Sequence, residues 1–201
     1  MRLYSMPSSG NSYKVRLLLA LLGRDCETVD VEYLTEALEQ AKAEGRLPFG
    51  KAPVLELDDG RLLPESNAIL CWLGEGTGFV PSDALDRAEM LSWMFWEQNQ
   101  HEGVIAVRAA LLSYPHRRAQ ATPERLAGLL DRGHELLGIM ERRLEDRDWL
   151  VGNGVSLADL CLYAYTHSAE SRGGFDLGRF PAVCRWLARI AALPGYKGLE
   201  A

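Results

Sequence analysis

The sequence predicts a mixed α/β domain at the N-terminus followed by an all-helical domain at the C-terminus. Three observations carry this prediction. Strand-like and helix-like segments alternate over the first third of the chain, glycine and proline break the periodicity at residues 74–83, and no convincing strand follows. We therefore place an α/β domain at residues 1–76, a linker at 77–83 and a helical domain at 84–201.

The α/β domain is expected to run strand, helix, strand, helix, two strands, helix. Its first strand and helix flank a turn rich in hydroxyl and amide side chains, and Gly23 supplies a C-cap for that helix. Asp58-Asp59-Gly60 is a hairpin turn signal between the last two strands. The expected elements cover residues 3–6, 15–23, 27–31, 35–45, 53–57, 61–63 and 66–74.

The second domain shows helical patterns only. Ser156, followed three residues later by Asp159, is a capping-box variant, so Asp159 is expected to fix the start of a core helix rather than to act in catalysis. The expected helices cover residues 84–112, as one long or kinked helix, 123–147, 156–169 and 181–193.

Composition places the chain among soluble globular proteins. It has 201 residues, 47% of them hydrophobic, and a formal charge of −6, which argues against nucleic-acid binding because such proteins present a basic surface. The longest apolar run, residues 17–22, is too short to span a bilayer, and no secretion signal pattern is found. We expect a cytoplasmic protein that binds neither membrane nor nucleic acid.

The cysteines and histidines form no metal-binding pattern. The four cysteines are spaced without a CxxC motif, which predicts free thiols in a cytoplasmic protein. The four histidines lack HxxxH partners, so we expect no metal.

A polar loop at residues 7–12 lies between the first expected strand and the first expected helix. Such a loop beside a helix N-terminus is a general anion site, because the first amides of the helix have no partner within it. This loop ends in a hydroxyl residue rather than in glycines, which excludes a phosphate-binding loop.

A binding groove is indicated by Pro53, which heads the apolar run 53–57. Because proline cannot donate a hydrogen bond to a neighbouring strand, this run is either an edge strand or follows an unusual peptide bond. If the Ala52–Pro53 bond is cis, the Ala52 backbone faces outward and can pair with a peptide. Glu65 and Ser66 then open a helix whose amides can receive a carboxylate. The two elements predict a groove for a small anionic peptide.

These segments resemble the glutathione transferase family, and the resemblance covers essentially the whole chain. Four pieces occur in the family's order and at its spacing, which makes the joint match specific. They are Leu3-Tyr4-Ser5 with Ser9-Gly10-Asn11-Ser12 and Lys14-Val15-Arg16, then Gly50-Lys51-Ala52-Pro53-Val54-Leu55-Glu56, Glu65-Ser66-Asn67-Ala68-Ile69 and Gly152-Asn153-Gly154-Val155-Ser156-Leu157-Ala158-Asp159. The resemblance is to the bacterial-type members with a serine-type active-site loop. It implies a homodimer with a thioredoxin-like N-terminal domain, an all-helical C-terminal domain and glutathione as co-substrate.

Within the loop, the resemblance implies that Ser9 is the catalytic residue and stabilises the glutathione thiolate. A free thiol has a pKa of about 8.5, and a hydroxyl donor and a helix N-terminus both favour its reactive anion. Asn11 is expected to bind glutathione as a further donor. The alternative is that Ser9, Asn11 and Ser12 only compete to cap the helix.

The remaining glutathione contacts also carry over from the family. The Ala52 backbone, held by a cis Pro53, would pair with the cysteinyl part of glutathione, and Glu65 with Ser66 would hold the γ-glutamyl ammonium and carboxylate. Lys51 would face the glycyl carboxylate. Helix capping is the alternative role of Glu65 and Ser66, and a solvated side chain is the alternative for Lys51.

The second substrate is expected to be a hydrophobic electrophile bound between the two domains. Trp93, Trp96 and His101 lie on the expected long helix, but two tryptophans at helical spacing are better explained by core packing. A lone helical histidine is usually solvated or packed rather than bound to a substrate.

The expected reaction is attack of the glutathione thiolate on an electrophilic carbon, as in detoxification. Two rivals remain open: glutathione-dependent reduction of disulfides or peroxides, with Asn11 holding the thiolate, and a non-catalytic binding or regulatory module. A glutathione-dependent isomerase ranks lower, because that group shows Ser-Ser-Cys where this chain has Ser9-Gly10-Asn11.

Overall fold

The computed structural model describes residues 1–199, which form two compact units. The first unit comprises residues 1–77 together with 191–199, and the second comprises residues 78–190. The end of the chain therefore groups with the first unit, whereas the sequence pattern assigns all of 84–201 to the helical domain. The last two residues of that expected domain lie outside the described part.

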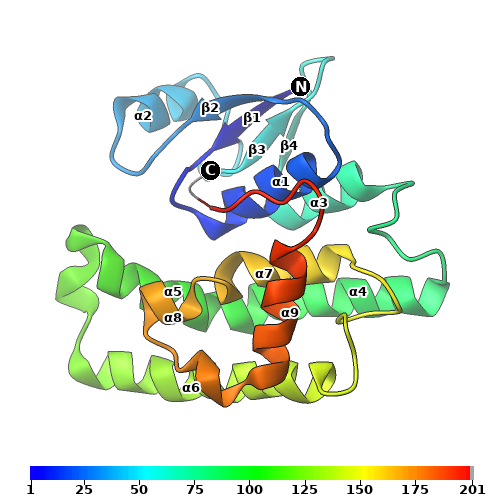
Figure 1. The fold of residues 1–201 in the computed structure, drawn as a ribbon. Coiled ribbons are helices and arrows are strands. Elements are labelled where there is room, and N and C mark those ends of the chain that lie inside the picture. Colours follow the sequence, from blue (N-terminus) through cyan, green and yellow to red (C-terminus); the bar gives the residue numbers. More distant parts are fainter. Residues whose placement is uncertain (200–201) are drawn as a thin grey trace. The chain divides into compact units, whose positions relative to one another are not determined.

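The first unit is built on a four-stranded mixed sheet with the strand order β2-β1-β3-β4. β1 and β2 are parallel, while β3 runs antiparallel to both β1 and β4. The strands are β1 (Arg2–Ser5), β2 (Glu27–Asp30), β3 (Val54–Glu56) and β4 (Leu62–Pro64), and the helices are α1 (Gly10–Leu21), α2 (Glu36–Ala43) and α3 (Ser66–Gly74) (Figure 1). The order of these elements confirms the expected α/β pattern.

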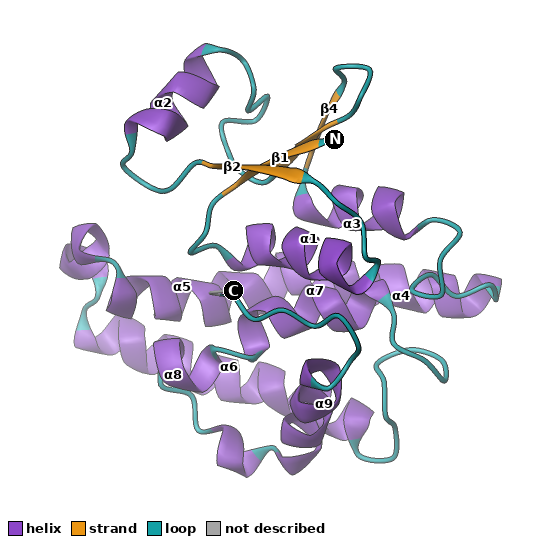
Figure 2. Ribbon diagram, turned by 45° about the horizontal axis from the view of Figure 1, so that its top comes forward, coloured by secondary structure: helices purple, strands orange, loops and turns teal. Residues whose placement is uncertain are grey.

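Alternating side chains of the sheet supply an apolar layer on each face. Tyr4 and Val54 lie opposite each other on β1 and β3 and belong to one buried cluster with Leu38 of α2. The alternate residues Leu3 and Leu55 are fully buried as well. Figure 2 shows α2 on one side of the sheet and α1 with α3 on the other. Both faces of the sheet are therefore covered.

Helix α1 begins at Gly10, earlier than the apolar pattern indicates at Val15. The residues between these positions carry no apolar helical signal, so the expected start was wrong. Ser9 has the extended backbone of an N-cap residue, and its carbonyl accepts a hydrogen bond from Tyr13 N (2.9 Å). As a result, Ser9 lies directly before the helix and Asn11 lies in its first turn.

Pro53 directly precedes β3, which is an inner strand of the sheet rather than an edge strand. The Ala52–Pro53 peptide bond is cis, which confirms the second of the two alternatives that the proline set. β3 pairs with β1 and β4 from Val54 onward, so Pro53 lies just outside the ladder of hydrogen bonds.

The second unit contains helices, turns and loops, with no strand among residues 78–190. The long helical pattern that starts at residue 84 is divided by a π-helical segment, Glu97–His101, which agrees with the kinked alternative. The helices are α4 (Ala84–Trp96), α5 (Glu102–Ser113), α6 (Pro123–Leu144), α7 (Leu157–Thr166), α8 (Ala169–Gly173) and α9 (Pro181–Ala191), with 3₁₀ segments at Pro115–Gln120 and Leu177–Arg179. The single helix expected at 156–169 is thus two.

Asp159 is fully buried, and its carboxylate accepts four hydrogen bonds from the surrounding chain. The donors are Leu150 N (2.9 Å), Ser156 N (2.8 Å), Ser156 Oγ (2.8 Å) and Trp186 Nε1 (2.9 Å). These bonds join the start of α7 to the preceding loop and to α9, which confirms the structural role expected for Asp159. Desolvation still raises the pKa of this carboxyl group.

Candidate active site

Three segments that carry the predicted site residues meet at one end of the sheet. Val54 pairs with Tyr4 on one side and with Pro64 on the other, so the end of β1, the start of β3 and the end of β4 are neighbours. The loop after β1 leads to Ser9, residues 51–53 lie before β3, and α3 follows β4 almost directly. Antiparallel pairing thus collects residues that are far apart in the sequence.

Asn11 and Ser66 connect the N-termini of two helices at this end of the sheet. Ser66 Oγ donates a hydrogen bond to Asn11 Oδ1 over 3.1 Å, and Ser66 is buried. The first turns of α1 and α3 therefore lie side by side. Each helix start carries amides without intrahelical partners and the positive end of a dipole, so the pair favours a bound anion. The structure brings together two of the predicted residues here.

Ser9 is half-buried, and its hydroxyl makes no capping hydrogen bond to α1. The neighbouring hydroxyls are engaged within the fold: Ser8 N and Oγ both donate to the Glu32 carboxylate (each 2.9 Å), and Ser12 Oγ accepts from Met6 N (2.9 Å). The geometry therefore speaks against the alternative in which Ser9 serves only as a helix cap through its side chain.

Glu65 has an unusual backbone conformation directly before α3. Its φ is +71° and its ψ is 116°, in the half of conformational space that side chains other than glycine rarely adopt. Its side chain is exposed and does not cap α3, which speaks against the capping alternative for this residue. Such strain costs about 1–3 kcal/mol and is concentrated at functional sites. Nothing in the sequence indicated this conformation.

The stretch before β3 contains the other three predicted residues. Pro53 is buried, Ala52 is half-buried and Lys51 is exposed. Within residues 1–199 the structure gives Lys51 no hydrogen bond or ion pair, so the geometry alone leaves its side chain solvated. Ala52 and Lys51 therefore lie at the expected end of the sheet, where Asn11 and Ser66 are in direct contact.

Both halves of the chain match models of one protein family. Residues 3–78 match the glutathione S-transferase N-terminal domain, and residues 104–194 match the glutathione S-transferase C-terminal domain. The chain belongs to the glutathione S-transferase family. Its thioredoxin-like first unit and helical second unit form the fold of that family.

Solved structures of glutathione S-transferases are similar to this family member over nearly its whole length. One from Pseudomonas fluorescens is 40% identical with a TM-score of 0.93, covering 100% of this chain and 98% of the other. One from Xanthobacter autotrophicus is 43% identical with a TM-score of 0.90, covering 98% and 96%. The disulfide-bond oxidoreductase YfcG of Escherichia coli is 28% identical over 96% of this chain and 90% of that protein. The proteins similar to this chain thus include ones named as transferases and one named as an oxidoreductase.

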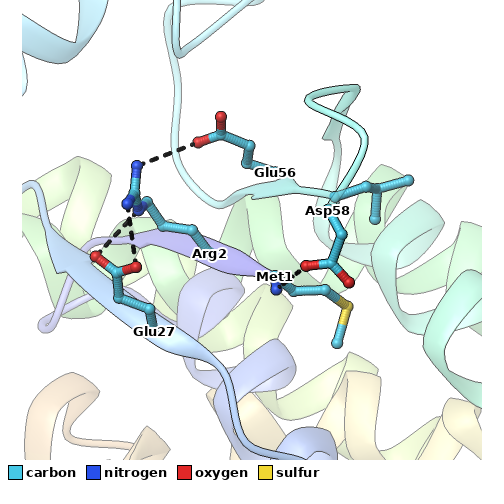
Figure 3. Close-up of a pocket in the computed structure, with 6 residues that line it drawn as sticks. Met1, Arg2, Glu27, Glu56 and Asp58 are labelled. Atoms are coloured by element: carbon cyan, nitrogen blue, oxygen red, sulfur yellow. Dashed lines mark hydrogen bonds and ion pairs between the residues drawn. The ribbon is translucent and has the colours of Figure 1, made fainter.

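A separate pocket of about 220 Å³ lies at the opposite end of the sheet from Ser9 in this glutathione S-transferase family member (Figure 3). Its charged groups pair with one another: Arg2 contacts Glu27 (3.1 Å) and Glu56 (3.7 Å), and the Met1 ammonium contacts Asp58 (2.6 Å). Because the charged groups of the pocket pair with one another, we assign this pocket no part in binding glutathione or in catalysis.

Three ring residues of the second unit, Trp93, Trp96 and His101, pack together. Trp93 and Trp96 contact edge to face with ring centroids 5.4 Å apart, and the Trp96 ring lies 5.8 Å from that of His101. His101 is fully buried, with Nε2 3.1 Å from Thr166 Oγ1. These contacts favour core packing over substrate binding for all three ring residues.

The four cysteines of this family member are free, and Cys161 is buried with its thiol directed at Glu97 Oε2 (3.2 Å). Burial raises the pKa of the Cys26, Cys71 and Cys184 thiols, which makes them poor nucleophiles. Among residues 1–199 no group of three His, Cys, Asp or Glu side chains is arranged to hold a metal ion.

Proposed function

We propose that this family member is a glutathione transferase in which Ser9 stabilises the thiolate of bound glutathione for attack on an electrophilic carbon. Membership of the family supports glutathione transferase activity. The observation that carries the finer assignment is the convergence of the Ser9 loop, residues 51–53 and the start of α3 at one end of the sheet.

Ser9 is the proposed donor to the sulfur because its hydroxyl is not used to cap α1. A hydrogen bond to the thiolate and the positive end of the α1 dipole both favour the anion over the thiol. Each unit by which the thiol pKa falls below about 8.5 corresponds to about 1.4 kcal/mol of preferential anion stabilisation. The proton then passes to solvent, and the sulfur keeps a lone pair for attack.

The rest of glutathione is proposed to lie across the same end of the sheet. The Ala52 backbone pairs with the cysteinyl part, as an extended peptide pairs with a strand. The Glu65 carboxylate receives the γ-glutamyl ammonium, and the backbone amide of Ser66 with the next amides of α3 receives the γ-glutamyl carboxylate. Lys51, which is exposed, reaches the glycyl carboxylate. Each charge of glutathione thus meets a group of opposite charge or a hydrogen-bond donor.

Glutathione-dependent disulfide reduction is the second candidate, and two observations favour it. The chain is similar to the E. coli disulfide-bond oxidoreductase, and Asn11 lies in the first turn of α1, close to where the sulfur would bind. Because Asn11 Oδ1 accepts the bond from Ser66, the amide group of Asn11 is held in one orientation. In this version Asn11 rather than Ser9 stabilises the thiolate.

The wider setting follows the family as well. We propose a homodimer in the cytoplasm that acts in detoxification on a hydrophobic electrophile, with functional domains at residues 1–76 and 84–201 joined by 77–83. In the described part of the chain, no helix combines the length and apolar character needed to cross a membrane.

The deciding experiment is calorimetry with glutathione, followed by rate measurements with a panel of aryl and alkyl electrophiles and with mixed disulfides. A transferase binds glutathione and forms conjugates, and a reductase binds it and turns over only mixed disulfides. Binding of glutathione without turnover of either class would identify a binding module, and absence of glutathione binding would refute the proposal.

A further inference from the structure

Arg16 is a charged residue on the apolar helix α1, and its guanidinium holds the loop that leads to Ser9. It donates hydrogen bonds to Ser5 Oγ (2.7 Å), to the Met6 carbonyl (3.4 Å) and to the Pro7 carbonyl (3.0 Å). A guanidinium can serve several acceptors at once because it presents five donors in a rigid planar fork. The three acceptors are consecutive in sequence, so one side chain contacts three successive residues at the end of β1 and the start of the loop.

Other side chains hold the neighbours of Pro7 in this loop, while Arg16 holds Pro7 itself. Ser12 Oγ accepts a bond from the amide that precedes Pro7 (2.9 Å), and Glu32 accepts two bonds from Ser8 (2.9 Å each). Proline has no N–H group, so its carbonyl is the single backbone group through which the residue can be held. A backbone bond from Ser9 N to the Met6 carbonyl (3.0 Å) closes the turn around Pro7 and Ser8, and the guanidinium adds the contact that holds Pro7 itself.

The same guanidinium also holds the end of the chain. Arg16 Nη2 donates to the Leu199 carbonyl (3.2 Å) as well as to the loop. Three residues earlier on α1, the hydroxyl of the buried Tyr13 donates to the Lys197 carbonyl (2.8 Å). Two side chains on one face of α1 thus bind two backbone carbonyls of the C-terminal segment.

Gly195 brings this segment against the other end of α1. Its φ is +83°, which favours glycine, and a Cβ at this position would lie 3.0 Å from the Ala20 carbonyl oxygen. We call residues 195–199 the C-terminal strap; it lies along α1 as the red end of the chain in Figure 1. Gly198, in the same strap, has open space where a Cβ would lie.

We propose that the C-terminal strap positions the Ser9 loop through Arg16, which makes Arg16 a positioning residue for thiolate formation. The inference rests on the proposed function of Ser9. Leu199 and Pro7 accept from the same guanidinium nitrogen, so a displaced strap lets the guanidinium rotate and loosens the loop. Ser9 is then misplaced relative to the sulfur, and a hydrogen bond weakens steeply with poor geometry.

A matched pair of glycine substitutions in the full-length chain tests this proposal. Gly195→Ala crowds the Ala20 carbonyl and strains the backbone, whereas Gly198→Ala adds the same methyl group in open space. We expect Gly195→Ala to lower kcat for conjugation by about tenfold and to leave KM for glutathione within about twofold, because misplacement affects rate more than binding. The thiol pKa of bound glutathione rises in that variant, and Gly198→Ala matches the unmodified protein.

A second matched pair examines the guanidinium. Arg16→Lys keeps the charge but loses the fork, so it is expected to give the same loss of kcat. Arg24→Lys is the control, since Arg24 donates to the Leu73 carbonyl (3.0 Å) away from the loop. Combining Gly195→Ala with Arg16→Lys is expected to add nothing to Arg16→Lys alone, because both act on one contact. Tyr13→Phe provides an independent strap variant that removes only a hydroxyl from a buried ring.

Hydrogen exchange without glutathione separates this inference from the proposed function. We expect the Ser8 and Ser9 amides to exchange about tenfold faster in Gly195→Ala than in Gly198→Ala, since the loop opens more often. Equal exchange in the two glycine variants, or additive losses in the double variant, would overturn the role of the strap. If the unmodified protein binds no glutathione, the proposed function fails, while the exchange rates still decide whether the strap holds the loop.

Discussion

Ser66 Oγ donates a hydrogen bond to Asn11 Oδ1 over 3.1 Å, which joins the first residue of α3 to the first turn of α1. Ser66 is only 3% exposed, so this bond is shielded from water. The two residues come from separate motifs of the sequence, and each was expected to contact glutathione independently. The structure joins them by a hydrogen bond, so a substitution at either residue removes a contact from the starts of both helices.

Ser66→Ala and Asn11→Ala are each expected to lower the free energy of unfolding by about 1 kcal/mol, because each leaves the other side of a shielded hydrogen bond without its partner. The double variant is expected to lose less than the sum, since one bond is removed once. Urea denaturation of the four proteins measures this coupling. Strictly additive losses would show that the bond contributes nothing to the fold.

Glu65→Gly is expected to be more stable than Glu65→Ala, which is the reverse of the order at an ordinary position. At an ordinary position glycine is less stable than alanine by about 0.5–1 kcal/mol, but at a φ of +71° alanine keeps the strain and glycine relieves it. We expect the free energy of unfolding of Glu65→Gly to be about 1 kcal/mol larger than that of Glu65→Ala. Thermal or urea denaturation decides the order, and a more stable Glu65→Ala would contradict the strain.

Both Glu65 variants are also expected to weaken glutathione binding, since each removes the carboxylate proposed for the γ-glutamyl ammonium. A hydrogen bond to a charged group contributes about 1.5–3 kcal/mol, which corresponds to a loss of affinity of about tenfold to a hundredfold. Calorimetry measures the affinity, and Glu75→Ala, at an exposed carboxylate just beyond α3, is the control. Unchanged affinity in the Glu65 variants would remove this residue from the site.

The fold could be predicted because its signals are local. Apolar alternation, hairpin residues and caps defined the order of strands and helices. A proline at the head of an apolar run indicated either an edge strand or an unusual peptide bond, and the structure has the second, a cis bond at Ala52–Pro53. The start of α1 was missed because the residues between Gly10 and Val15 carry no apolar helical pattern. The π-helical segment Glu97–His101 was hidden within a continuous helical pattern, since one extra residue per turn leaves no compositional mark.

The residues that support the site could not be predicted, because their contacts are distant in sequence. Arg16 is 183 positions from Leu199, and Ser8 is 24 positions from Glu32. A single arginine within an apolar helix is as compatible with solvent exposure as with a structural role. The positive φ of Glu65 also depends on how β4 meets α3, which no local residue preference specifies.

The stability of the protein is expected to fall as the pH drops below about 6.5, partly because of His167. Burial lowers the pKa of this imidazole from its ordinary value of 6.5. The unfolded chain therefore takes up a proton at a higher pH than the folded chain does, which favours unfolding between the two pKa values. Burial also lowers the pKa of His134, so both side chains contribute in the same direction.

Urea denaturation at several pH values between about 7 and about 5 measures this effect, with the slope given by the difference in bound protons. His167→Gln is expected to reduce the slope, and His134→Gln to reduce it further. His116→Gln changes an exposed histidine and is the control. An unchanged slope in the His167 and His134 variants would show that these imidazoles titrate alike in both states.

Ser9→Ala is expected to leave glutathione bound but to raise the pKa of its thiol, because one donor to the sulfur anion is lost. The ultraviolet absorbance of the bound thiolate, followed against pH, measures this pKa. Conjugation at neutral pH should fall by about 10²–10³-fold if Ser9 is the main donor to the developing charge, while circular dichroism shows an intact fold. Ser113→Ala, at an exposed serine at the end of α5, should change neither quantity.

Asn11→Ala distinguishes the two chemistries proposed for the site. If it raises the thiol pKa more than Ser9→Ala does, Asn11 holds the thiolate and disulfide reduction becomes the better assignment. Because Asn11 also receives the bond from Ser66, its direct effect has to be separated from displacement of α3. Ser66→Ala breaks the same bond and leaves the Asn11 amide in place, so the difference between these two variants isolates the amide's contact with sulfur. If none of the three substitutions moves the thiol pKa or the rate, the loop serves only to start α1, and neither Ser9 nor Asn11 holds the thiolate.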